Sequence, residues 1–248
     1  MKQVLLVTGG SRGIGAATAL LAAAKGHAVA VNYAGRADAA AQVVQRISDA
    51  GGRAVAVQGD VAIEADVLRL FAEVDSRLGP LTGLVNNAGV VDVSARLEDM
   101  SAARLKRMFD INVIGTMLCA REAVKRMGKR HGGSGGAIVN VSSAASRLGS
   151  PGQYVDYAAA KGAVDAFTIG LAKEVAADGI RVNAVRPGLI DTEIHASGGL
   201  PDRVRDLAHL VPMGRGGTAE EVAQAIVWLL SPEASYTTMS MLDVSGGR

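Results

Sequence analysis

Seven short runs of β-branched and other apolar residues recur along the chain, and they constrain the fold more than any other feature. The runs span residues 3–8, 28–33, 53–58, 81–87, 137–143, 180–187 and 239–245. Most are continuously apolar rather than alternating, as strands are when both faces of a parallel sheet are buried. We therefore expect a parallel sheet of seven strands.

Between these runs lie Ala- and Leu-rich segments whose apolar residues recur with helical spacing. Several segments end in a glycine, where a helix commonly stops with a left-handed residue: Gly26, Gly51, Gly79 and Gly179. Strands that alternate with helices through right-handed crossovers predict an α/β fold, with a doubly wound sheet and helices on both faces. The ligand site of such a sheet lies beyond the carboxyl ends of its strands.

The length of 248 residues predicts a single domain, residues 1–248, because domains commonly reach this size. No internal repeat and no change of composition marks a linker. The glycine-punctuated region 188–217 follows the sixth run and is a candidate substrate lid.

Composition excludes several classes of function. With 26 basic and 24 acidic residues and only 3% aromatic residues, the chain lacks the footprint of a nucleic-acid-binding protein. The single cysteine, Cys119, excludes an internal disulfide and a multi-cysteine metal cluster, and four scattered histidines predict no zinc site. No segment has the character of a membrane span or secretory signal, so we expect no membrane partner and a cytoplasmic location.

A glycine loop, "VTGGSRGIG" at residues 7–15, follows the first run directly and opens the first helix. Glycines permit a tight turn and a close approach of backbone to phosphate, and the helix N-terminus offers free N–H groups to an anion. The spacing T-G-x-x-x-G-x-G differs from the common G-x-G-x-x-G fingerprint, and there is no G-K-[ST] of a P-loop. The alternative is that these glycines serve only a tight turn between strand and helix.

The stretch "QYVDYAAAKG" at residues 153–162 places Tyr157 and Lys161 one helical turn apart. A phenol normally titrates near ~10, and a cation on the same helix face would lower its pKa and make it a usable acid or base. Tyr154 lies two turns from Lys161, too far for the same effect, and is more simply a residue that packs or lines a pocket. Alone, the Tyr–Lys spacing is also typical of an ordinary amphipathic helix.

The sequence resembles the classical short-chain dehydrogenase/reductase family, because the motifs of that family occur in it in order. The motifs that carry the resemblance are Thr8-Gly9-x-x-x-Gly13-Ile14-Gly15, Asp60-Val61, Asn86-Asn87-Ala88-Gly89, Asn112, Ser143, Tyr157-x-x-x-Lys161, Pro187-Gly188 and Val244-x-Gly246-Gly247. The ordered set covers essentially the whole chain and is far more specific than any one motif. The resemblance implies a single Rossmann domain with a seven-stranded parallel sheet, commonly assembled as a homotetramer or homodimer.

The resemblance also implies a catalytic set. Ser143 would hydrogen-bond the substrate oxygen, Tyr157 would exchange the proton, and Lys161 would anchor the nicotinamide ribose. Asn112 matches an asparagine that in relatives holds a water beside the lysine. Ser142 competes with Ser143, but side chains alternate along a strand, so only one of the two should face the cofactor.

The expected dinucleotide site gathers segments from six parts of the chain. The glycine loop contributes to it, Asp60 and Val61 would border the adenine, and Pro187 to Thr192 would meet the nicotinamide. Asp60 is alternatively, or additionally, an N-cap for the helix that follows. The full set is Gly9, Ser11, Arg12, Gly13, Ile14, Gly15, Asn32, Tyr33, Arg36, Asp60, Val61, Asn87, Ala88, Gly89, Tyr157, Lys161, Pro187, Gly188, Ile190 and Thr192.

The residues after the second run favour NADP(H) over NAD(H). NAD-selective Rossmann domains usually carry Asp or Glu there to hold the ribose 2′-hydroxyl, whereas this chain has Asn32 and Tyr33. Arg12 and Arg36 could supply the forked donors that a 2′-phosphate favours. Arg36 could equally be a solvated residue at a helix start.

We therefore expect an NADP-dependent oxidoreductase that interconverts a ketone or 3-oxo group and a secondary alcohol, with a small carbonyl or alcohol compound as partner. The alternatives are an NAD-linked alcohol or sugar dehydrogenase and a non-catalytic dinucleotide sensor. A methyltransferase would explain neither the Tyr–Lys pair nor the missing acid.

Two departures from the family pattern stand out. Met239 replaces a common glycine, and the separation of Ser143 from Tyr157 is one residue longer than in many members. The second predicts an altered substrate pocket. The natural substrate is left open by the sequence.

Overall fold

The computed structural model describes residues 3–248, apart from the side chains of residues 195 and 196. Its sheet has seven parallel strands in the order β3-β2-β1-β4-β5-β6-β7. The strands are β1 Val4–Val7, β2 Ala28–Tyr33, β3 Arg53–Gln58, β4 Gly83–Asn86, β5 Gly136–Val141, β6 Ile180–Pro187 and β7 Met241–Val244. The order places β1 and β4 side by side. From β1 the chain adds β2 and β3 on one side, and from β4 it adds β5, β6 and β7 on the other.

Ten α-helices connect and cover these strands within the described residues. They are α1 Gly13–Ala24, α2 Ala37–Asp49, α3 Glu64–Leu78, α4 Ala102–Phe109, α5 Gly115–Met127, α6 Ala145–Leu148, α7 Val155–Val175, α8 Ile194–Ser197, α9 Arg203–Leu207 and α10 Ala219–Leu230. A π-helical turn, Asp110–Ile114, joins α4 to α5.

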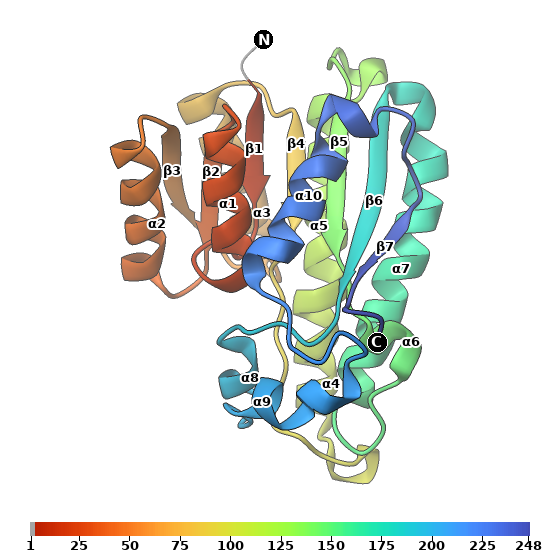
Figure 1. Cartoon of the computed structure of the whole chain (residues 1–248). Coiled ribbons are helices and arrows are strands. Elements are labelled where there is room, and N and C mark those ends of the chain that lie inside the picture. The colour runs from red at the N-terminus through yellow and green to blue at the C-terminus, as the bar shows by residue number, and fades with distance from the viewer. Residues whose placement is uncertain (1–2) are drawn as a thin grey trace.

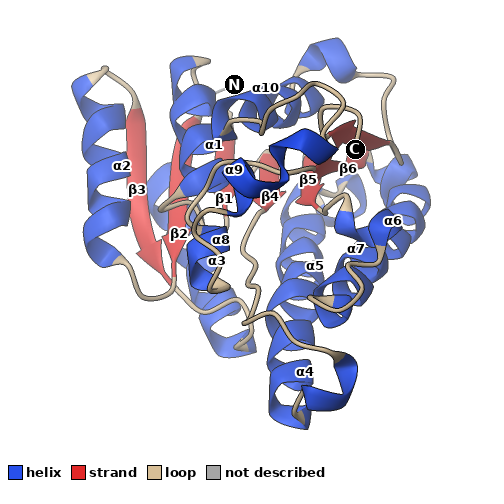
Figure 2. Ribbon diagram, turned by 60° about the horizontal axis from the view of Figure 1, so that its bottom comes forward, coloured by secondary structure: helices blue, strands red, loops and turns tan. Residues whose placement is uncertain are grey.

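The core consists of two apolar layers, one on each face of the sheet. Val4 and Leu6 of β1 pack with α3, α5 and α7, while Leu5 and Val7 pack with α1, α2 and α10. Figures 1 and 2 show these two groups of helices on opposite faces. The doubly wound α/β fold expected from the sequence is confirmed, because successive strand residues enter opposite layers and both must be apolar.

Strand boundaries follow the sequence prediction closely. The strands β2, β3 and β6 span the predicted residues, whereas β7 begins at Met241, two residues later than predicted. Met239 has φ 64°, a left-handed conformation that no regular strand contains. The chain therefore turns at this residue before it enters the sheet.

The carboxyl ends of the strands meet at one edge of the sheet, the lower edge in Figure 1. The short helices α6, α8 and α9 and the C-terminal end of the chain lie at this same edge. Within residues 3–248, no helix is long and apolar enough to cross a membrane.

Candidate functional site

Two neighbouring cavities lie at the carboxyl edge of the sheet. The first cavity, about 380 Å³, is lined by the glycine loop and by the ends of β2, β3 and β4. The second cavity, about 460 Å³, is lined by the end of β5, the start of α7 and the segment after β6. Five residues line both cavities, so a long ligand can extend from one into the other: Ile14, Asn87, Gly89, Thr192 and Ile194.

Most sequence-predicted cofactor residues line these cavities. Those lining the first are Gly9, Ser11, Arg12, Gly13, Ile14, Asn32, Tyr33, Arg36, Asp60, Val61, Asn87, Ala88, Gly89 and Thr192. Those lining the second include Ser143, Tyr157, Lys161, Pro187, Gly188 and Ile190. Gly15 and Asn112 line neither cavity and support residues that do.

The glycine loop is held in a fixed, close-packed form. Gly9 has φ 58°, and a Cβ on it would lie 2.9 Å from Cα of Ala88. A Cβ on Gly15 would lie 2.4 Å from the carbonyl oxygen of Gly9. The Asn87 amide donates to the carbonyls of Thr8 and Gly9 at 3.0 and 2.9 Å and so ties the loop to the end of β4. Glycine is required at both loop positions because any side chain would displace backbone.

The N-terminus of α1 opens onto the first cavity. Its N-cap residue, Arg12, makes no side-chain capping bond, and the first turn contains no acidic residue. The N–H groups of this turn therefore remain available for an anion, and the helix dipole favours a negative charge there. These features fit the pyrophosphate of a dinucleotide.

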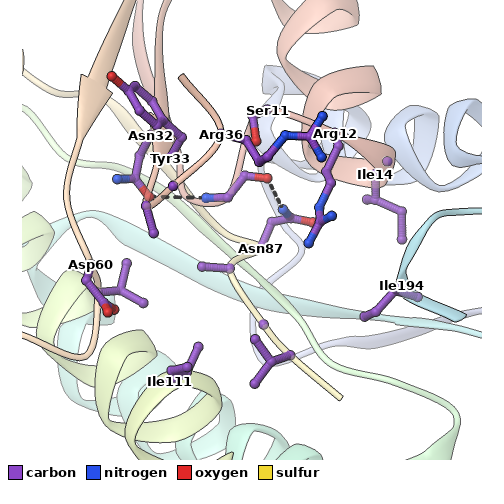
Figure 3. A pocket seen from close by; sticks show the side chains of 18 of the residues that line it. Ser11, Arg12, Ile14, Asn32, Tyr33, Arg36, Asp60, Asn87, Ile111 and Ile194 are labelled. Carbon is purple, nitrogen blue, oxygen red and sulfur yellow. Dashed lines mark hydrogen bonds between the residues drawn. The ribbon is translucent and has the colours of Figure 1, made fainter. Parts of the chain in front are cut away.

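The structure changes the interpretation of Asn32. Its Nδ2 donates to the carbonyl of Gly59 at 2.9 Å, and its Oδ1 accepts from the Gly9 N–H at 3.2 Å. The side chain is buried and joins the glycine loop to the end of β3 (Figure 3). Asn32 thus supports the loop through both of its amide atoms, and its direct contact with a cofactor stays a prediction.

Two arginines at the first cavity remain accessible. Arg12 pairs with Glu193 at 3.4 Å and Arg36 with Asp38 at 3.4 Å, and all four side chains are exposed. Exposed ion pairs of this kind contribute little free energy, so a phosphate can replace the carboxylates. No acidic side chain replaces the missing carboxylate at the end of β2, since Tyr33 follows Asn32 there.

The expectation that Asp60 caps the next helix is wrong. Helix α3 begins at Glu64, its N-cap is Ile63, and no side chain caps it. Asp60 instead accepts the N–H of Ala62 at 3.0 Å through its Oδ1, within the turn that precedes the helix. Its place on the wall of the first cavity is as expected.

The two serines after β5 have different environments. Ser142 is buried, and its hydroxyl donates to the carbonyl of Lys161 at 3.3 Å. The Ser143 hydroxyl accepts the N–H of Ala145 at 3.1 Å and lines the second cavity together with the Tyr157 phenol. Ser143 lines the second cavity, so its hydroxyl is able to rotate and donate a hydrogen bond to a ligand there.

Tyr157 and Lys161 share a helix face, but burial dominates their titration. Burial raises the pKa of Tyr157 to about 12, and the Ser143 hydroxyl lowers it only in part. Burial lowers the pKa of Lys161 to about 8, against the attraction of Asp165. The Lys161 Nζ lies 5.5 Å from the centre of the Tyr157 ring and donates to the Val141 carbonyl at 2.7 Å.

The expectation that Lys161 lowers the pKa of Tyr157 is therefore wrong when only the protein's own groups act on the phenol. The loss of water around the phenol outweighs the effect of the nearby ammonium. A phenol with a raised pKa keeps its proton at neutral pH, so Tyr157 holds the proton that a donor needs, but the raised pKa also makes it a weaker acid than a free phenol.

Asn112 lies beneath this group in the π-helical turn. Its Nδ2 donates to the carbonyls of Val90 and Met108, and its Oδ1 accepts the N–H of Val90 at 3.2 Å. A Cβ on Gly89 would lie 2.7 Å from this Oδ1 and 3.6 Å from the Lys161 Nζ. Asn112 thus fixes the loop after β4 against the lysine, at a kind of helix irregularity that is frequent at functional sites.

The segment after β6 closes the second cavity. Gly188 donates to the carbonyl of Val244 at 3.0 Å, and a Cβ on it would lie 2.7 Å from Cα of Ser245. Region 188–217 then forms α8 and α9 beside the cavity. Tyr154 is buried in the wall, as expected for a residue that packs or lines the pocket.

Sequence reasoning missed two charged residues of the second cavity, Arg203 and Arg248. Neither residue belongs to a motif. Arg203 lies in the predicted lid, but it is one of several charged residues there and nothing in the sequence distinguishes it. Their convergence depends on how α9 and the segment after β7 fold over the sheet edge, which no local pattern records.

Comparisons with known proteins agree with this geometry. Residues 9–248 match a family model described as enoyl-(acyl carrier protein) reductase. A solved short-chain dehydrogenase/reductase of Serratia marcescens, a double mutant, superposes with a TM-score of 0.91 at 34% identity, over 99% of this chain and 97% of the other. The chain belongs to the short-chain dehydrogenase/reductase family. It is an NAD(P)-dependent oxidoreductase.

Relatives within this family carry the names of different enzymes. An uncharacterized oxidoreductase of Escherichia coli K12 is 58% identical over 99% of both chains. A 3-oxoacyl-[acyl-carrier-protein] reductase of Synechocystis is 40% identical over 99% of this chain and 96% of the relative. A cis-4-hydroxycyclohexanecarboxylate dehydrogenase of Sinomonas cyclohexanicum is 41% identical over the same shares. Family membership thus establishes the class of enzyme and leaves its substrate open.

Proposed function

We propose that the chain is an NADP(H)-dependent oxidoreductase that interconverts a ketone and a secondary alcohol. One observation carries the proposal. The side chains of Ser143 and Tyr157 line a cavity that adjoins and shares residues with the cavity of the glycine loop. A carbonyl oxygen beside these hydroxyls and a nicotinamide between the cavities would be in reach of each other.

Each catalytic side chain has a defined task in this proposal. Ser143 donates a hydrogen bond to the carbonyl oxygen, and Tyr157 transfers its phenolic proton to that oxygen as the alcohol forms. When bound, the nicotinamide supplies the hydride to the carbonyl carbon. Lys161 and Asn112 hold the floor of the site, through Val141 and Val90 respectively.

A screen of ketones tests the reaction. With NADPH and an accepted ketone, we expect Ser143→Ala to lower kcat about 10²- to 10³-fold, the loss that follows removal of one donor to a developing oxyanion. Ser142→Ala is the matched control and should retain most activity, because its hydroxyl bonds the Lys161 carbonyl. Loss of activity in the Ser142 variant alone would reverse the assignment of the two serines.

The preference for NADP(H) rests on Arg12 and Arg36. Both line the first cavity, and neither has a buried carboxylate partner among the described residues. The forked guanidinium suits a 2′-phosphate, and the end of β2 offers no carboxylate to a free 2′-hydroxyl. The alternative, an NAD-linked alcohol or sugar dehydrogenase, would need its ribose contacts from Tyr33 or from backbone.

Steady-state kinetics with both cofactors test this preference. We expect kcat/KM to be higher with NADPH than with NADH, and Arg36→Leu to lower the NADPH value about 10- to 100-fold, as loss of a charged hydrogen bond does. The value for NADH should change much less. Arg46→Leu, an exposed site on the same helix, is the control. Equal use of NADH by the wild type would overturn the assignment.

Assembly and location are further parts of the proposal. A homotetramer or homodimer is supported by exposed apolar side chains near the open edge of the sheet, Trp228 of α10 and Met239 before β7. The intact Ser143–Tyr157–Lys161 set disfavours a non-catalytic dinucleotide sensor. We retain a cytoplasmic location and a mobile lid at 188–217 as predictions.

A further inference from the structure

The charged side chains on the described lining of the second cavity are all basic. Its ionisable side chains other than the tyrosines are Lys161 at the floor, Arg203 of α9 and Arg248 after β7, and its lining residues include no Asp or Glu. Lys161 belongs to the catalytic set proposed above. The two arginines have no part in that chemistry and need another explanation.

Arg203 lies against an aromatic ring rather than an acid. Its Cζ is 5.2 Å from the centre of the Tyr154 ring, and the Tyr154 hydroxyl donates to the carbonyl of Gly198 at 3.5 Å. Within residues 3–248, no ion pair involves Arg203. Two positions along α9, the exposed Arg205 pairs with both Asp202 and Asp206. A stacked guanidinium keeps its N–H edge available for a planar acceptor.

The surroundings of Arg203 make its charge costly without an anion. Burial lowers the pKa of Arg203 and the charge of Arg248 lowers it further, while Tyr154 acts in the opposite direction. Acids of this region pair with other arginines: Asp202 with Arg205 at 3.0 Å and Asp243 with Arg147 at 3.4 Å. Like charges that share a cavity without a counter-ion attract an anionic ligand.

The anion is not a phosphate of the dinucleotide in this account. The glycine loop and the N-terminus of α1 provide the phosphate site in the first cavity, whereas Arg203 and Arg248 line the second. The group they would bind is therefore part of the substrate, which also has to place a carbonyl at Ser143 and Tyr157. A cavity of about 460 Å³ is of the size that holds a small molecule.

We propose that the substrate is an oxo acid, or the matching hydroxy acid, whose carboxylate is bound by Arg203 with help from Arg248. This inference rests on the proposed function and names the substrate class of the same site. A carboxylate is planar and matches the guanidinium fork with two parallel hydrogen bonds. Tyr154 holds the fork in place and is a positioning residue.

Matched acid and ester substrates test the inference. With NADPH, we expect the wild type to have a lower KM for 4-oxocyclohexanecarboxylate than for its methyl ester. Arg203→Leu should raise the KM for the acid about 10- to 100-fold, the cost of a lost charged hydrogen bond, with much smaller effects on its kcat and on the ester. Arg203→Lys should recover part of the affinity, and Arg205→Leu is the control on the same helix. Equal KM values for acid and ester in the wild type, or equal losses for both in Arg203→Leu, would overturn the proposal.

A binding measurement separates this inference from the proposed reaction. In the presence of NADP⁺, cyclohexanecarboxylate should raise the thermal unfolding midpoint of the wild type and of Arg205→Leu, but not of Arg203→Leu. The neutral cyclohexanecarboxamide should raise none of them. If no ketone is reduced yet the carboxylate still binds through Arg203, the proposed function fails and the anion site stands. If ketones are reduced and the carboxylate does not bind, the anion site fails alone.

Discussion

Tyr157 and Lys161 show how tertiary packing changes the chemistry that a sequence motif suggests. Their i, i+4 spacing correctly predicts a shared helix face. The spacing cannot predict their pKa values, because these depend on burial. Tyr157, for example, packs against Met108 and Val113, which come from another part of the chain. The identities of the site residues follow from local motifs, whereas their electrostatics follow from packing.

The lowered pKa of Lys161 predicts a pH-dependent stability. Between its folded value of about 8 and its unfolded value near 10.5, Lys161 binds a proton more readily in the unfolded chain, so its contribution to the free energy of unfolding rises with pH across this window. We expect Lys161→Met to abolish this rise. Its stability relative to wild type should be highest below pH 8 and fall by up to ~3 kcal/mol as pH approaches 10.5, at about 1.4 kcal/mol per pH unit. Chemical denaturation of both proteins across this range measures the difference. A constant difference would contradict the lowered pKa.

At the scale of elements, the sequence predicted most of the sheet. Strands buried on both faces carry continuous apolar runs, so β2, β3 and β6 could be located to the residue. The start of β7 was misplaced because Met239 adopts a left-handed conformation that its side chain gives no reason to expect. The π-helical turn at Asp110–Ile114 was also not predicted. It adds one residue to an otherwise regular helix, and the apolar periodicity of the sequence does not reveal such an addition.

The left-handed conformation of Met239 predicts that glycine at this position gives a more stable protein than a residue with a Cβ. A residue with a Cβ costs roughly 1–2 kcal/mol in the left-handed region, and glycine avoids this cost. We expect Met239→Gly to be more stable than Met239→Ala by about 1 kcal/mol, which corresponds to ~2–4 °C in Tm for a chain of this size. Both variants lose the same half-exposed side chain, so the comparison isolates the backbone. Equal Tm values would show that the turn carries no strain.

For the whole molecule, the carboxyl edge of the sheet brings together segments that are far apart in sequence. The glycine loop, the end of β5, the start of α7 and the segment after β6 were predicted to converge, because parallel strands end at one edge. The addition of Arg203 and Arg248 was not predicted, since it depends on the course of irregular segments. The loop between Ser143 and Tyr157 contributes Leu148, Ser150 and Gln153 to the second cavity, and the effect of its extra residue on the pocket stays a prediction.

The single-turnover rate of NADPH oxidation by Tyr157→Phe, with a neutral ketone at saturation, tests the central claim most directly. The phenol is assigned as the proton donor, so its loss should slow this step about 10²- to 10⁴-fold. The dissociation constant for NADPH, measured by titration, should stay close to that of wild type and of Tyr236→Phe, a fully exposed control. A Tyr157→Phe enzyme that binds NADPH normally and turns over near the wild-type rate would contradict the account.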